Sequence, residues 1–170
     1  MWFALRVTYG RELKFQKSLQ EASFETFVPM KKKKFEKEGK EYTKIVPAVS
    51  NLCFVNSEKG ALDAFLNNQG PDNIARYIWD RATGNPAIVP QKAMESFIKV
   101  CSVMSDDVLY INEISPKLQA GTKVRVLEGP FKGVEGTVAR IKRSRRVVVE
   151  LPGMLAVATT YVEPQSLELI

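Results

Sequence analysis

The last fifty residues constrain the fold most strongly, because short alternating segments recur there between glycine turns. Residues 121–142, GTKVRVLEGPFKGVEGTVARIK, alternate apolar and polar side chains on either side of a Gly-Pro-Phe-Lys-Gly loop. Such alternation is typical of half-buried strands, and several short strands separated by turns indicate a small barrel or sandwich. We therefore expect a five-stranded β-barrel, with strands at residues 122–127, 134–142, 147–151, 155–160 and 166–170.

The first hundred residues carry a mixed pattern. Residues 2–9 alternate with one fully apolar face, and residues 11–22 place apolar side chains at helical spacing. The chain then shows a strand at 25–29, a lysine-rich hairpin that turns near Gly39, an apolar strand at 51–55, a helix capped by Ser57, a strand at 74–79 and a helix from Pro90. This order predicts an α+β sandwich with helices packed on a mostly antiparallel sheet.

The two patterns are separated by residues of different composition. Residues 102–120 contain Ser-Asp-Asp, a short apolar patch and Ser-Pro, which are typical of a connection. We therefore predict an amino-terminal domain at residues 1–104, a linker at 105–120 and the barrel at 121–170, and we expect the two domains to fold and function separately.

Composition excludes several classes of function. The chain has 170 residues, of which 45% are hydrophobic, and no histidine. The missing histidine argues against a zinc site and against histidine-based catalysis. Cys53 and Cys101 lie in apolar runs, which favours buried thiols over a disulfide. No apolar run is long enough to span a membrane and the start does not resemble a signal peptide, so we expect a cytoplasmic, monomeric protein without a membrane partner, cofactor or metal.

Positive charge is concentrated in two places. The net charge is +6, and residues 31–44 hold seven lysines against three glutamates. A second cluster has no acidic residue and consists of Arg140, Lys142, Arg143, Arg145 and Arg146. Each run alone fits a solvated hairpin tip, but two basic tips on one small protein favour a polyanionic partner.

Residues 121–142 resemble the KOW motif, in which glycines flank a loop that holds an aromatic residue. Gly129, Gly133 and Gly136 are expected to provide positive φ angles or close backbone approach, and Phe131 to plug one end of the barrel. KOW barrels occur in ribosomal and transcription proteins, so this motif alone leaves both classes open.

The preceding domain resembles the amino-terminal domain of the NusG family of transcription elongation factors. The matching stretches are WFALRVTYGRELK, FVPM, VPAVSNLCFV and NPAIVPQKAMESFI, and with the barrel the resemblance covers almost the whole chain. RYIWDRATGNPAIVPQKAM and RRVVVELPGMLAVATTYVEPQSLELI are most similar to the UpxY-type regulators of Bacteroides-like bacteria, which antiterminate capsular polysaccharide operons.

The resemblance implies a non-enzymatic factor that binds the clamp helices of the RNA polymerase β′ subunit and suppresses pausing or termination. By position, the implied polymerase-binding residues are Leu52, Phe54 and Met94, bordered by Arg6, Ser50 and Ala82. Core packing is the alternative role for Phe54 and Met94, because both residues are apolar.

The resemblance also implies contact with upstream or non-template DNA. Arg11, Lys14 and Lys17 are expected on the outer face of the first helix, and Lys31 and Lys32 are candidates for phosphate contacts, with a solvated loop as the alternative. For the barrel, the implied second partner is a ribosomal small-subunit protein or Rho. The arginines of the barrel are equally suited to contact with RNA.

An enzyme is disfavoured because the chain shows no convergent catalytic set. The only adjacent acidic residues, Asp106 and Asp107, fall in the predicted linker, and the sequence contains no phosphate-binding glycine loop. The stronger competing function is a ribosome-associated KOW-type RNA-binding protein.

Overall fold

The computed structural model describes residues 1–170 and separates them into two compact units. The first unit contains residues 1–29 and 49–91, and the second contains residues 30–48 and 92–170. The division therefore does not follow the predicted boundary at residue 104, because the lysine-rich hairpin and the helix after residue 91 cluster with the carboxy-terminal strands. No helix is long and apolar enough to cross a membrane.

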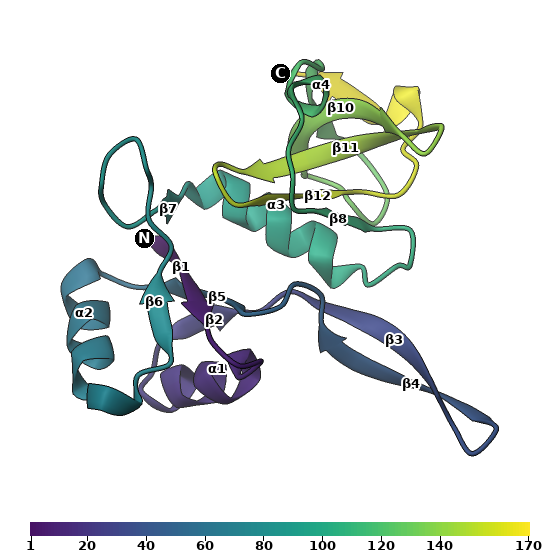
Figure 1. The fold of residues 1–170 in the computed structure, drawn as a ribbon. Helices are drawn as coiled ribbons and strands as arrows, with labels where there is room; N and C mark the ends of the chain where they lie inside the picture. Colours follow the sequence, from purple (N-terminus) through teal and green to yellow (C-terminus); the bar gives the residue numbers. More distant parts are fainter. The chain divides into compact units, whose positions relative to one another are not determined.

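The first unit is built on an antiparallel sheet (Figure 1). Its strands have the order β2-β5-β1-β6, and β7 pairs with the same edge of β1 as β6. The elements of this unit are β1 (Trp2–Val7), α1 (Glu12–Glu21), β2 (Glu25–Phe27), β5 (Leu52–Asn56), α2 (Lys59–Asn68), the 3-10 turn η1 (Gly70–Asp72), β6 (Ala75–Tyr77) and β7 (Ile88–Val89).

Both α1 and α2 pack on the same face of this sheet. Leu5 lies opposite Cys53 on β5 and Tyr77 on β6, so these three side chains share a face. The Tyr77 hydroxyl donates to Asp63 of α2 at 2.7 Å, and Cys53 lies within electrostatic range of Glu12 of α1. The helices cover this face because their apolar residues recur at helical spacing, and the opposite face of the sheet is left without either helix.

The second unit contains a six-stranded antiparallel sheet with the order β13-β9-β10-β11-β12-β8. A separate two-stranded sheet, β3 (Met30–Lys37) with β4 (Lys40–Pro47), belongs to the same unit. The other elements are α3 (Gln91–Ser102), β8 (Leu109–Ile111), α4 (Pro116–Gln119), β9 (Lys123–Val126), β10 (Glu135–Ile141), β11 (Ser144–Leu151), β12 (Leu155–Ala158), the 3-10 turn η2 (Pro164–Ser166) and β13 (Leu167–Leu169).

All five strands predicted for the carboxy-terminal part are present as β9–β13, and the structure adds a sixth. β8 lies inside the predicted linker and pairs with β12, Tyr110 opposite Val157. The residues LYI of the patch VLYI thus form an edge strand of the sheet, which the sequence did not predict. The predicted cap at Ser57 is also wrong: α2 begins after Glu58, and the Ser57 hydroxyl donates to the Glu58 carbonyl.

Helix α3 is attached to the six-stranded sheet of its unit. The Glu135 backbone N–H donates to the Ser96 hydroxyl at 3.1 Å, and this link joins the middle of α3 to the start of β10. The apolar face of the helix is fully buried and consists of Met94, Phe97, Val100 and Cys101. Burial of that face at helical spacing accounts for the helix that the sequence predicts.

Candidate protein and nucleic-acid interfaces

The face of the first sheet opposite α1 and α2 is apolar, and we call it the docking face. It is formed by Trp2, Ala4, Leu52 and Phe54, because Ala4 lies opposite Phe54 in the β1–β5 ladder. All four residues are buried, and Phe54 is 0% exposed. A partner can therefore reach Phe54 only after a conformational step uncovers this face.

Charged and polar residues lie around the docking face. Arg6, which is exposed, pairs with Leu52 on one side and with Arg76 on the other, so two arginines stand at the end of the face. Ser50 and Ala82 are exposed and lie in turns of the same unit. Arg76 is not among the interface residues predicted from the sequence. Its position beside the docking face follows from its pairing with Arg6.

Met94 does not belong to the same unit as the other implied polymerase-binding residues. It lies on α3, within the second unit, and it is 0% exposed. The structure thus groups Arg6, Ser50, Leu52, Phe54 and Ala82 in the first unit, and places Met94 on an apolar helix face of the second.

The basic residues of the first helix are accessible. Lys14 and Lys17 are exposed on α1, and Arg11 is exposed at the residue before it. Their spacing of three residues places them along one side of the helix. Arg11 also lies over the ring of Tyr9, 5.8 Å from its centroid, and Tyr9 is 82% exposed. This side of α1 combines positive charge with an accessible aromatic ring, which suits contact with nucleic acid.

Lys31 and Lys32 are exposed neighbours on β3, and they point to opposite faces of the β3–β4 hairpin. Lys31 pairs with Val46 and Lys32 with Ile45, and side chains alternate between faces along a strand. The two lysines therefore leave the strand on different faces of the hairpin.

The glycines of the KOW motif show both predicted features, a positive φ angle and close backbone approach. Gly129 and Gly133 have φ angles of +82° and +89°, which side chains rarely adopt. Gly136 is different, because a Cβ atom there would lie 2.3 Å from the Val148 carbonyl oxygen. Phe131 is buried at 4% exposure, and its carbonyl accepts from the Val134 N–H at 3.0 Å.

The second basic cluster is divided between surface and interior. Arg140 and Arg145 are exposed and lie opposite each other at the β10–β11 hairpin, whose turn contains Lys142 and Arg143 with positive φ. Arg146, in contrast, is only 6% exposed, and its guanidinium donates to the carbonyls of Asp107 and Thr159. The sequence-based placement of Arg146 on a solvated tip is therefore wrong.

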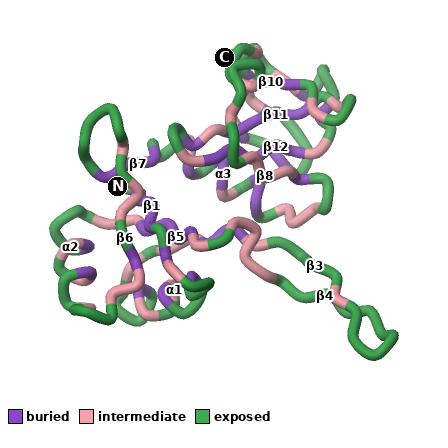
Figure 2. The backbone as a smooth tube through the Cα atoms, in the orientation of Figure 1, coloured by how far each residue is buried: buried purple, intermediate pink, exposed green.

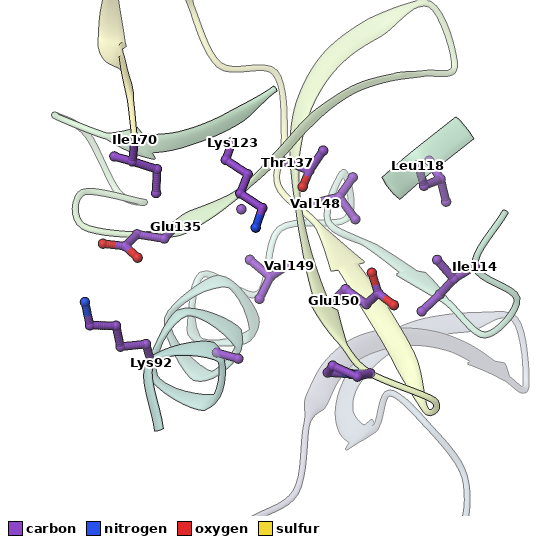
Figure 3. Close-up of a pocket in the computed structure, with 13 residues that line it drawn as sticks. Lys92, Ile114, Leu118, Lys123, Glu135, Thr137, Val148, Val149, Glu150 and Ile170 are labelled. Atoms are coloured by element: carbon purple, nitrogen blue, oxygen red, sulfur yellow. The ribbon is translucent and has the colours of Figure 1, made fainter. Parts of the chain in front are cut away.

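The second unit contains a pocket of about 350 Å³ beside β10 and β11 (Figure 3). Its carboxylates are already engaged: Glu135 pairs with Arg125 at 2.7 Å, and Glu150 accepts from Gln119 at 2.9 Å. The hydrogen bond from Arg125 is the main cause that lowers the pKa of Glu135. Glu135 is therefore engaged by Arg125 and Glu150 by Gln119, and the two carboxylates do not form an acid and base pair with each other.

Neither cysteine is suited to nucleophilic chemistry. Burial is the main cause that raises the pKa of both the Cys53 and the Cys101 thiol to about 12. The reactive species of cysteine is the thiolate, which is scarce at neutral pH when the pKa is so high. Both thiols are free and act as small apolar side chains of the core.

Comparison with known proteins gives two family matches. Residues 1–98 match the family model described as "Transcription termination factor nusG", and residues 120–150 match the model "KOW motif". Among solved structures, the chain is similar to "Domain interaction in Thermotoga maritima NusG", with 16% identity and a TM-score of 0.47, over 99% of this chain and 96% of that one. No curated protein matches. The first family model covers more than half of the chain.

Proposed function

Because the chain belongs to the NusG family, we propose that it uses its docking face to bind the clamp helices of the RNA polymerase β′ subunit and thereby suppresses pausing or termination. The coarser assignment follows from the family: the protein is a non-enzymatic transcription elongation and antitermination factor that binds RNA polymerase. The observation that supports our choice of surface is a sheet face rich in apolar residues on which neither α1 nor α2 packs.

The residues that support docking are Leu52 and Phe54 at the centre, with Arg6, Ser50 and Ala82 in the same unit. An apolar centre with a charged rim is the usual composition of a protein interface. Phe54 and Leu52 are buried in the structure, so the apparent affinity includes the free energy of uncovering them. We also propose Met94, on α3 of the second unit, as a polymerase-binding residue.

We expect Phe54→Leu to weaken binding to RNA polymerase by about 1–3 kcal/mol, because aromatic anchors dominate interface energies. The substitution keeps an apolar side chain, so its effect on folding should be smaller than that of alanine. The measurement is a titration of core polymerase with the labelled full-length protein, accompanied by thermal unfolding of each variant.

Val55→Ala is the matched control, because Val55 is equally buried on the adjacent position but points to the helix-covered face. It should lower stability and leave polymerase affinity unchanged. If affinity falls in proportion to melting temperature in both variants, Phe54 is a core residue and the docking face is misassigned.

We propose that α1 faces upstream or non-template DNA through Arg11, Lys14 and Lys17. Their exposure and their common side of the helix support this contact. Lys31 and Lys32, on the β3–β4 hairpin, are further candidates for phosphate contacts in the same complex.

We expect the triple variant Arg11→Gln, Lys14→Gln and Lys17→Gln to reduce the salt dependence of binding to an assembled elongation complex. Each phosphate contact on duplex contributes about 0.9 to the log–log slope, so the slope should flatten by up to about 2.7. A salt titration of the complex measures it.

The matched control replaces Arg140, Arg143 and Arg145 with glutamine. All three residues are exposed, and their replacement removes the same amount of positive charge as the α1 variant. Arg146 is kept, since it is buried. Equal slopes for the α1 variant and the wild type would contradict the DNA-facing assignment of α1, whereas a flattened slope in the control alone would move DNA contact to the second unit.

We further propose that the KOW part recruits a second partner, a ribosomal small-subunit protein or Rho, while the amino-terminal part binds polymerase. The separate matches at residues 1–98 and 120–150 support this division. We propose an amino-terminal domain at residues 1–104, a linker at 105–120 and a KOW domain at 121–170. We also propose a cytoplasmic protein of the UpxY type that acts on a specific operon, such as one for capsular polysaccharide. Mapping polymerase occupancy with and without the protein tests that assignment.

A further inference from the structure

The β3–β4 hairpin has two faces of different chemistry. The two strands pair from Met30↔Pro47 to Lys37↔Lys40, and residues directly opposite each other lie on the same face. Five lysines therefore share one face and none of the hairpin's strand carboxylates joins them: Lys31, Lys33, Lys37, Lys40 and Lys44. The other face carries Lys32 and Lys34 against Glu36 and Glu41. The formal charges are thus +5 on the first face and 2 − 2 = 0 on the second.

An aromatic pair lies in the middle of the charged face, which we call the basic-aromatic face. Phe35 and Tyr42 are cross-strand partners, stacked with a centroid distance of 5.4 Å and an interplanar angle of 16°. The Lys33 ammonium lies over the Phe35 ring, 5.3 Å from its centroid. Tyr42 is 46% exposed, so part of this stack is accessible. The strands form a two-stranded sheet of their own (Figure 1), and Figure 2 shows most of their residues as exposed.

Folding alone does not account for this arrangement. Lys33 lies directly opposite Lys44, and Lys37 opposite Lys40, and like charges in these positions destabilise a strand pair. A two-stranded sheet without a third strand is only marginally stable in water, so it can least accommodate repulsion. The same lysines alternated with the glutamates would give a more stable hairpin. The concentration of charge on one face therefore indicates a ligand that neutralises it.

We propose that the basic-aromatic face binds an unpaired DNA strand, with the lysines on its phosphates and a base stacked on the Phe35–Tyr42 pair. This inference rests on the proposed function, in which the hairpin contacts DNA of the transcription complex, and it names the face and the form of the DNA. Alternate residues of a strand are about 6.8 Å apart, a spacing comparable to that of successive phosphates in an extended strand.

The combination of charge and stacked rings favours a single strand over other polyanions. Aromatic platforms in basic grooves bind bases of any sequence, because every base has a π-face. In a duplex the base faces are stacked on one another, so only the lysines would contribute there. An acidic protein surface would use the lysines and leave the accessible aromatic pair without a role.

The test uses the full-length protein and fluorescein-labelled oligodeoxythymidylate of about 15 nucleotides, a length within the usual range of single-strand sites. Anisotropy titrations at several salt concentrations compare two double variants: Lys33→Gln with Lys44→Gln on the basic-aromatic face, and Lys32→Gln with Lys34→Gln on the other. Both variants remove two charges from the same hairpin. The first removes a like-charge pair and also the contact of Lys33 with Phe35, so circular dichroism and thermal unfolding of both variants check that the hairpin is retained.

We expect the basic-aromatic variant to lose about tenfold or more in affinity and to flatten the log–log salt slope by up to about 1.4, at about 0.7 per phosphate contact. The matched variant should lose less than about threefold, because its lysines face away from the strand and act only at longer range. Tyr42→Ala should lose about fivefold or more, and Tyr42→Phe should retain affinity, because stacking needs the ring and not the hydroxyl.

Three results would overturn the inference. The first is equal losses for the two double variants, and the second is equal affinity of the wild type for the single strand and for a duplex of the same length. The third is oligouridylate bound about tenfold more tightly than oligodeoxythymidylate, which would assign the face to RNA. The assay contains no polymerase, so failure here leaves the proposed docking untouched, and failure of polymerase binding leaves this result standing.

Discussion

Gly136→Ala is expected to destabilise the second unit by about 3 kcal/mol, at the upper end of ordinary single substitutions. A Cβ atom at residue 136 would lie 2.3 Å from the Val148 carbonyl oxygen and 2.9 Å from a methyl carbon of Val147. The oxygen belongs to the backbone of β11, so the clash is relieved only if β10 and β11 move apart. Chemical denaturation, together with hydrogen exchange of the β10–β11 amides, measures the effect.

Gly60→Ala is the matched control for this prediction. Gly60 lies in α2 of the first unit, and a Cβ atom there would have no neighbour within 4 Å. Alanine should therefore be neutral or stabilise the helix by up to about 1 kcal/mol. If Gly136→Ala unfolds at the same denaturant concentration as the wild type, the close approach of β10 to β11 is not a constraint on the fold.

Arg146→Met is expected to destabilise the second unit by about 2–4 kcal/mol, because it removes charged hydrogen-bond donors from two carbonyls. The guanidinium joins the carbonyl of Asp107, in the segment before β8, to that of Thr159, after β12. Thr159 is 0% exposed, so its carbonyl has little access to replacement water. Denaturant unfolding measures the change, and we expect the amides around β8 to lose protection first.

Arg145→Met controls for the loss of charge at this hairpin. Arg145 is the neighbouring residue, is exposed and forms no ion pair among the salt bridges of the structure. Its substitution should change stability by less than about 0.5 kcal/mol. Similar destabilisation by both variants would show that charge at the hairpin, and not the buried contacts of Arg146, is responsible.

Most of the strands and helices could be predicted from the sequence, because each carries its period locally. Residues 2–7 alternate and form β1, and the carboxy-terminal alternation forms β9–β13. The conformation of the KOW loop was also predictable, since Gly129 and Gly133 adopt the positive φ that their residue type allows.

Other elements were not predictable because their stability comes from partners distant in the chain. β8 has only three residues and becomes a strand through pairing with β12. β7 has two residues and pairs with β1. Local propensity is too weak to identify segments this short, so the composition of residues 105–120 predicts a linker and no strand.

For the candidate interfaces too, some features follow from local sequence patterns and others from pairing between distant segments. The amino-acid sequence specifies which segments carry charge or apolar side chains, and so predicts the basic run at residues 31–44 and the apolar strand that contains Phe54. Which of those side chains share a face depends on the folded chain: strand pairing places Lys31 and Lys32 on different faces and stacks Phe35 on Tyr42, and packing buries Arg146. The physical reason is that composition is a property of each segment, whereas facing and burial depend on strand register and on packing between residues far apart in the chain.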